Sequence, residues 1–305
     1  MKTKTKIIIL TLLIQLSGVV IFAQQDTTYI YSSGSLIYKK SVAEIDSMKF
    51  SGDTQKTINF FSSGNIVFER LVTDIDSIIF YDASITVTDI DNNTYTTIQI
   101  GDQIWMAENL RTTRYNDGTT IPNVTDNSSW EGLSTGAYSW YNNNSTNTRP
   151  YGGIYNGYAV ETGKLCPSGW HVPSDSEWTE LEIYLQNNDY NYDGTIDDDQ
   201  DRNTNNKISK SLALETLWNS STTEGAAGNT DYPEYRNKSA FNAVPGGCRN
   251  YDGSYSSMGN IGFWWSDTES SETNLYGRNI RYNAIDTYRG GYHKINGFSV
   301  RCVMD

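Results

Sequence analysis

A short acidic segment at positions 189–197 carries the side chains that a calcium loop uses. Its sequence, DYNYDGTID, matches the first nine positions of an EF-hand-type loop, with glycine at the sixth. The expected ligands are Asp189, Asn191, Asp193, the carbonyl oxygen of Thr195, and Asp197. Position twelve is Gln200, whose neutral amide cannot supply the usual bidentate carboxylate. The segment therefore predicts a calcium loop without its closing ligand, and a solvated acidic insertion is the alternative.

Other residues that could perform chemistry are few. No Cys-x-x-Cys, His-Glu-x-x-His, Gly-x-Ser-x-Gly or phosphate-binding glycine loop occurs. Of the two histidines, His171 stands in a turn before an expected helix, where we expect a structural hydrogen bond, and His293 is expected in a surface loop. Carboxylates are numerous, but nothing singles out two of them as a hydrolytic pair. The sequence predicts no catalytic residue.

The first residues of the chain predict export. Three lysines precede an apolar run from Ile7 to Phe22, and the small residue Ala23 precedes Gln24, as in a cleavable signal peptide spanning residues 1–23. A membrane anchor is the alternative, but the run falls short of the ~20 apolar residues that a span needs. We expect a secreted, periplasmic or cell-surface protein with no transmembrane segment after cleavage. In that oxidising environment, three cysteines predict one disulfide and one free thiol.

Composition limits the partners of the chain. The 305 residues carry a formal charge of −13, so the basic surface that binds nucleic acid is absent. Aromatic residues make up 13% of the chain, a content that supports a packed core rather than disorder. We therefore expect a folded extracellular protein that does not bind nucleic acid.

Two copies of one pattern lie in residues 24–82. Residues 31–50 and 61–80 align at an offset of thirty positions, and each begins with an aromatic residue followed by Ser-Ser-Gly. Each copy predicts a β-hairpin around the Ser-Gly turn, a short helical turn (42–45 or 72–75) and a third strand. Solenoids need about three repeats or more, so we expect a small β-rich repeat domain or a docking segment. Similar units precede other modules in exported Bacteroidetes proteins.

From Ser84 onward, short apolar runs alternate with Asn, Gly, Ser and Thr, which favours short strands and long loops. Two helices are expected. The first spans Ser174 to Gln186, where Ser174 and Glu177 match a capping box, and the second spans Ile208 to Leu217. The expected fold class is α+β, with helices on irregular β-sheets.

Four motifs after position 100 occur in a recognisable order. They are IWMAENL (104–110), LCPSGWHVP (165–173), GGCRNYDG (246–253) with GFWWS (262–266), and GFSVRCV (297–303). Together they resemble the Fibrobacter succinogenes major paralogous domain over residues 83–305. More distantly, the segments at 172–181 and 297–303 are similar to the formylglycine-generating, sulfatase-modifying enzymes. That resemblance implies a C-type-lectin-like fold, with 300–303 as its closing strand.

The resemblance also carries expectations about the cysteines. In a C-type-lectin-like fold the first helix and the last strand lie side by side, which implies a disulfide between Cys166 and Cys302. The enzyme relatives bind copper with a closely spaced cysteine pair, and that pair is missing here. Cys248 is alone and departs from the family's usual residue after Gly-Gly, so we expect an incidental buried thiol.

The leading expectation is a non-catalytic binding or cell-surface structural module that recognises glycan or protein through long loops. The segment 138–158 is rich in Tyr and Asn and is a candidate sugar-stacking surface, although core packing is the alternative role of its aromatic residues. The sequence motifs of calcium-dependent lectins are absent. A second hypothesis is an enzyme, related either to the formylglycine-generating oxidases or to carboxylate-based hydrolases. A third is an assembly or adhesin subunit, whose strand edges the two repeats supply.

Overall fold

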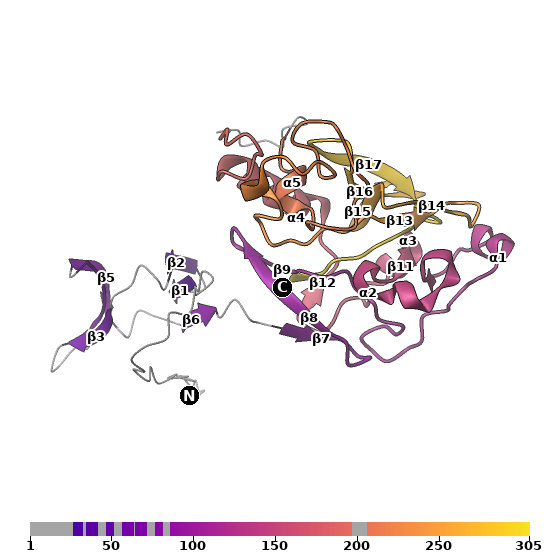
Figure 1. Cartoon of the computed structure of the whole chain (residues 1–305). Helices are drawn as coiled ribbons and strands as arrows, with labels where there is room; N and C mark the ends of the chain where they lie inside the picture. Colours follow the sequence, from indigo (N-terminus) through magenta and orange to yellow (C-terminus); the bar gives the residue numbers. More distant parts are fainter. Residues whose placement is uncertain are drawn as a thin grey trace, which may run out of the picture. The chain divides into compact units, whose positions relative to one another are not determined.

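The computed structural model describes residues 27–32, 35–41, 47–51, 57–63, 65–71, 77–81, 86–196 and 206–305. The chain divides into two units, Met1–Ala83 and Ser84–Asp305, and each is described separately (Figure 1). The expected signal peptide at 1–23, the helical turns at 42–45 and 72–75, and Asp197 lie outside the described residues.

The described part of the first unit consists of six strands. They are β1 (Thr27–Ser32), β2 (Ser35–Ser41), β3 (Ser47–Ser51), β4 (Thr57–Ser62), β5 (Asn65–Leu71) and β6 (Ser77–Tyr81). The two predicted hairpins are β1–β2 and β4–β5. The strands form two sheets, in the orders β2-β1-β6 and β3-β4-β5. Ile58, Phe60 and Phe68 are buried, with the two phenylalanine ring centroids 5.7 Å apart. The alternating sequence of each repeat therefore forms strands as expected.

The described part of the second unit contains two sheets. The smaller sheet has the order β12-β19-β9-β8-β7, and the larger has the order β10-β11-β18-β13-β15-β16-β17, with β14 on β13. The strands are β7 (Thr86–Thr88), β8 (Thr94–Ile100), β9 (Gln103–Met106), β10 (Tyr138–Ser139), β11 (Ile154–Asn156), β12 (Trp170–His171), β13 (Gly246–Arg249), β14 (Tyr255–Met258), β15 (Ile261–Ser271), β16 (Asn274–Arg281), β17 (Thr287–His293), β18 (Gly297–Phe298) and β19 (Val303–Met304). With the helices described next, the unit is a mixed α+β structure, as expected. The closing strand begins at Val303, not at Val300.

The first expected helix is confirmed as α4 (Asp175–Asn187). Ser174 and Glu177 form both hydrogen bonds of the capping box, which satisfies amide groups that the first turn leaves without helical partners. The buried Arg278 of β16 fixes the helix against the larger sheet, because its guanidinium contacts Asp175 at 2.7 Å and Glu182 at 3.1 Å. The start and the middle of α4 are thus both fixed by named polar contacts.

The second expected helix is much shorter than predicted, since α5 spans only Ser209–Leu212. Ala213 is extended and forms a parallel bridge with Ala243, and the amide of Leu214 donates to the carbonyl of Ala243 at 2.8 Å. This pairing uses the backbone groups that a helix to Leu217 would need. The other short helical segments are α1 (Asn127–Glu131), η3 (Tyr141–Asn143), η4 (Ser145–Asn147), α2 (Thr148–Tyr151), α3 (Gly157–Val160) and η5 (Pro233–Tyr235).

Four tryptophans of the family-like segments are buried in the interior of the second unit, and Trp170 of the LCPSGWHVP motif is partly buried against it. Trp105, Trp178 and Trp264 lie in one hydrophobic cluster with Phe241, and Trp265 lies in another with the disulfide. The Trp105 and Trp178 ring centroids are 4.8 Å apart. Among the helices of the described ranges, none has the length and apolar character of a membrane span.

Candidate functional site

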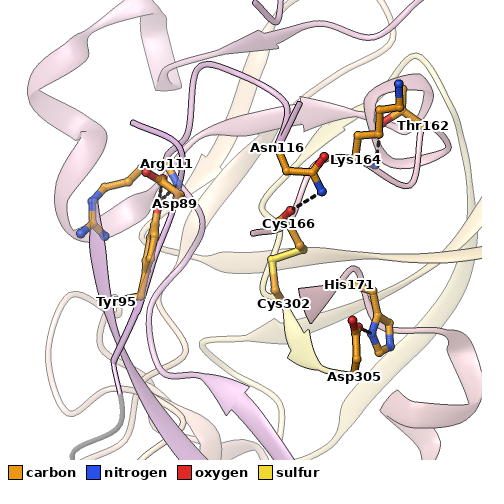
Figure 2. Close-up of a disulfide and its surroundings, with 10 residues drawn as sticks. All are labelled: Asp89, Tyr95, Arg111, Asn116, Thr162, Lys164, Cys166, His171, Cys302 and Asp305. Atoms are coloured by element: carbon orange, nitrogen blue, oxygen red, sulfur yellow. Dashed lines mark hydrogen bonds and ion pairs between the residues drawn. A yellow bond between two sulfur atoms is a disulfide. The ribbon is translucent and has the colours of Figure 1, made fainter. Parts of the chain in front are cut away.

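A disulfide closes the second unit around its last strand. Cys166 and Cys302 are bonded with an S–S distance of 2.02 Å and a Cα–Cα distance of 6.0 Å (Figure 2). Beside the bond, β12 pairs with β19, so that His171 lies opposite Val303. The disulfide pairing that the family resemblance implied is confirmed. The strand β12, which precedes α4 in the chain, lies beside the closing strand β19.

His171 links that strand pair to α4. Its Nδ1 lies 2.7 Å from Asp305 Oδ1 (Figure 2). Its Nε2 lies 2.8 Å from Glu177 Oε1. Burial opposes the charged imidazolium, but the hydrogen bonds to Asp305 and Glu177 outweigh it and raise the pKa of His171. Both ring nitrogens are therefore engaged by carboxylates, an arrangement that matches the expected structural role.

The remaining histidine and cysteine are also held within the fold. His293 is the last residue of β17 and accepts a hydrogen bond from the Ile295 amide, so the prediction of a surface loop there is wrong. The free thiol of Cys248 is buried and lies 3.4 Å from Ser256 Oγ. Burial raises the pKa of Cys248, so its thiol stays protonated and weakly nucleophilic near neutral pH.

The described part of the acidic segment contacts lysines. Asp189 Oδ2 lies 2.7 Å from Lys238 Nζ, and Asp193 Oδ2 lies 2.5 Å from Lys207 Nζ. Asn191 is buried and donates from Nδ2 to the Thr195 carbonyl at 2.8 Å. A calcium ion at these residues would therefore have to displace two ammonium groups. Calcium binding stays a prediction.

The aromatic residues of segment 138–158 serve mainly as core. Tyr138, Trp140 and Tyr155 are buried, and the other three tyrosines of the segment are half-buried. The Trp265 indole donates to the Tyr155 carbonyl at 2.8 Å, which ties the segment to β15. The segment thus follows the core-packing alternative, and exposed aromatic surface lies elsewhere.

One face of the β16–β17 hairpin carries the exposed side chains of Tyr288 and Arg281, with Tyr292 half-buried and Asn279 buried beneath them. Asn279 is opposite Tyr288, and Arg281 and Tyr292 lie on the same face by strand alternation. We call these four residues the Tyr288 face. Tyr288 is 47% exposed, and the Arg281 guanidinium lies 4.9 Å from its ring centroid. The face therefore offers an open phenol ring beside a cation.

Hydrogen bonds order the polar groups of the Tyr288 face. Asn279 Nδ2 donates to the Tyr292 hydroxyl at 2.7 Å, and Arg281 Nε donates to Asn279 Oδ1 at 3.1 Å. Burial raises the pKa of Tyr292 to about 12, so its hydroxyl is neutral at physiological pH. The side chains of this face are thus held in a defined arrangement before any ligand arrives.

Glycine between the two tyrosines lets a ring approach the sheet. Gly290 is opposite Gly277, midway between Tyr288 and Tyr292 along β17. A Cβ atom at Gly290 would lie 2.8 Å from Tyr288 Cε1 and 3.4 Å from Tyr292 Cε2. The Tyr288 ring therefore rests against backbone at Gly290. The sequence analysis did not predict this face. The alternation of Tyr288, Gly290 and Tyr292 could have indicated it, because alternate residues of a strand lie on one face.

Two fully buried arginines hold the loops of the second unit. Arg301 donates to the carbonyl of Phe241, to Asn242 O at 3.2 Å and to Asn109 Oδ1 at 2.9 Å. Arg249 donates to the carbonyls of residues 124–126 and 253 and lies over the Trp130 ring at 4.2 Å. Irregular segments far apart in sequence are thereby fixed to β13 and to the residues before β19.

Comparison with known proteins follows this geometry. A family model described as the Fibrobacter succinogenes major domain matches residues 98–304, which is more than half of the chain. No curated protein and no solved structure matches. The match includes the disulfide, α4 and the Tyr288 face. The chain belongs to the Fibrobacter succinogenes major domain family.

Proposed function

We propose that the second unit is a non-catalytic binding module of an exported protein and that carbohydrate is its ligand. The observation that carries this proposal is the Tyr288 face, where a half-exposed phenol ring rests on glycine beside a guanidinium and an ordered amide. An open aromatic ring stacks on the apolar face of a sugar, and the exposed Arg281 guanidinium, positioned by the buried Asn279 amide, donates hydrogen bonds to its hydroxyls. A protein ligand is the alternative occupant.

The proposed architecture is C-type-lectin-like. Two contacts support it: the disulfide between Cys166 and Cys302 and the pairing of β12 with β19. Such a scaffold fixes a core and leaves loops and strand ends to carry recognition. The buried arginines support the same role, because they fix long irregular segments without regular secondary structure.

The cysteines favour binding over oxidation chemistry. Of the three cysteines, Cys166 and Cys302 are bonded to each other, and the Cys248 thiol is buried with a raised pKa. A copper site of the formylglycine-generating kind needs two accessible thiolates. An enzyme would be supported instead if the purified protein bound copper tightly and oxidised a cysteine-containing peptide.

A glycan array tests the proposal. We expect the protein from Gln24 onward to bind a subset of oligosaccharides, and Tyr288→Ala to reduce that binding at least tenfold because stacking and the ordered contacts are lost together. Tyr251→Ala is the matched control, since Tyr251 is 45% exposed but lies outside the Tyr288 face. Glycan binding that survives Tyr288→Ala, or that both variants lose equally, would contradict a site at this face.

A further inference from the structure

The thirty-residue repeat is reproduced residue by residue in the strand register of the first unit. Thr27 pairs with Ser41 in one hairpin, and Thr57 pairs with Leu71 in the other, each thirty positions later. Both hairpins also shift register between the fourth and fifth residues of their first strand. The two hairpins are therefore equivalent structures.

The third strand of each repeat does not pair with its own hairpin. β3 ends the first repeat and pairs with β4 of the second, whereas β6 ends the second repeat and pairs with β1 of the first. The registers of these two pairs also coincide. Ser51 lies opposite Thr57 in β3–β4, and Tyr81 lies opposite Thr27 in β1–β6. Each hairpin therefore accepts the third strand of another repeat at one fixed register.

The two equivalent pairs differ in how the chain connects them. β3 runs into β4 through residues 52–56, so that pair is closed by a short local connection. β1 and β6 are the first and last of the strands described in the unit, and the chain between them runs through the other four. The β1–β6 pair is consequently the one that can open without breaking a hairpin.

We propose that β1 also accepts β6 from a second copy of this chain, so that the repeats join chains edge to edge. The hydrogen bonds and register of that contact are those of the β1–β6 pair within one chain. The interchain pair therefore competes with the β1–β6 pair within one chain. The balance between them depends on the effective concentration of β6 within its own chain and on the protein concentration. Reciprocal exchange gives a closed dimer, and one-way exchange gives a head-to-tail ring or filament.

A second copy fits this edge better than an unrelated strand. β1 and β4 are equivalent acceptors. Each takes a strand that ends a repeat and begins with the serine after an Ile-Asp pair, Ser77 in β6 and Ser47 in β3, at the same register. An open β1 would expose unpaired backbone amides and carbonyls in the pattern that β6 satisfies. The proposal concerns the first unit alone and does not depend on the function of the Tyr288 face.

Register-matched cysteines test the exchange in the chain from Gln24 onward, with Cys248→Ser as background. Thr27→Cys and Tyr81→Cys proteins are prepared separately, mixed and oxidised, and interchain disulfides are counted on non-reducing gels. Ser51→Cys mixed with Thr57→Cys is the matched control, because its short connection keeps that pair within one chain. We expect several-fold more mixed disulfide from the first mixture, rising with concentration, and a light-scattering mass above that of one chain.

The double variant Thr27→Cys/Tyr81→Cys completes the test, since it reports pairing whether the unit is closed or exchanged. We expect it to form intrachain disulfides at low concentration and interchain disulfides at high concentration. Intrachain bonds at every concentration, with no more mixed disulfide than in the control, would overturn the proposal. Failure of the double variant to form either bond would also overturn it, because β1 and β6 would then not pair at this register.

Discussion

At the residue scale, buried cations take the place that apolar side chains usually hold in a core. Arg301 and Arg249 are fully buried, and among the described residues their hydrogen-bond acceptors are neutral carbonyl and amide oxygens. All three Arg249 guanidinium nitrogens donate to oxygen atoms, whereas Arg301 donates only through its two terminal nitrogens and its buried Nε has no hydrogen-bond partner among the described residues. Each guanidinium lies over an aromatic ring. A guanidinium has five donors in a fixed plane, so one side chain can hold several loop carbonyls at once.

We expect Arg301→Met to destabilise the protein by about 2–4 kcal/mol, because the carbonyls of Phe241 and Asn242 lose their arginine donor while most of the side-chain volume is kept. Urea unfolding followed by tryptophan fluorescence measures the change. Arg149→Met is the control, since that side chain is 67% exposed and a surface change of this kind stays within about 0.5 kcal/mol. Equal unfolding midpoints for the two variants would show that the Arg301 contacts do not stabilise the fold.

His171 makes stability depend on pH. The pKa of His171 is raised in the folded protein. Its contribution to the free energy of unfolding is therefore fully present below the unfolded pKa of ~6.5 and is lost as pH rises through the folded pKa. We expect His171→Gln to lower the melting temperature more at about pH 5.5 than at about pH 9. Asp305→Asn removes one of the two carboxylate partners and should reduce this difference. A melting-temperature loss that is the same at both pH values would contradict the assignment.

At the scale of elements, local signals were sufficient where the partners are close in sequence. The capping box located α4, and the repeat located both hairpins. The end of α5 could not be predicted, because the bridge that terminates it involves Ala243, about thirty positions away. The strand that pairs with β6 could not be predicted either, because β1 and β4 have equivalent sequence patterns. The structure shows that β6 pairs with β1 and β3 with β4.

The acidic segment at 189–197 gives a test at the same scale. Calcium must compete there with Lys207 and Lys238, so we expect Lys207→Gln/Lys238→Gln to show a larger rise of melting temperature in millimolar calcium than the unchanged protein. Differential scanning calorimetry with calcium and with a chelator measures both. Should neither protein respond, the segment is not a calcium loop.

At the scale of the whole molecule, the sheet order was beyond sequence reasoning. The larger sheet places β18 between β11 and β13, which lie about ninety residues apart, and it joins β13 to β15 in parallel. The Tyr288 face was missed for a related reason, because strand alternation identifies a shared face but not which face stays exposed. One disulfide was predictable from three cysteines and the expected export, but its pairing was predictable only through the family resemblance.

We expect reduction of the Cys166–Cys302 bond to cost about 5 kcal/mol, because it closes a loop of 136 residues in the unfolded chain. Denaturant unfolding with and without reductant measures this difference, and Cys166→Ser/Cys302→Ser should match the reduced protein. An unchanged unfolding midpoint on reduction would mean that the bond does not restrict the unfolded chain as expected.

The same bond changes what a single proteolytic cut does to the protein. Cys166 and Cys302 enclose β13 to β17 and every loop between them. A single cut anywhere in that interval leaves two fragments that stay covalently attached, and the strands on both sides of the cut remain held in their sheet. A nicked molecule would therefore migrate as one species until it is reduced, and it would keep the Tyr288 face in place.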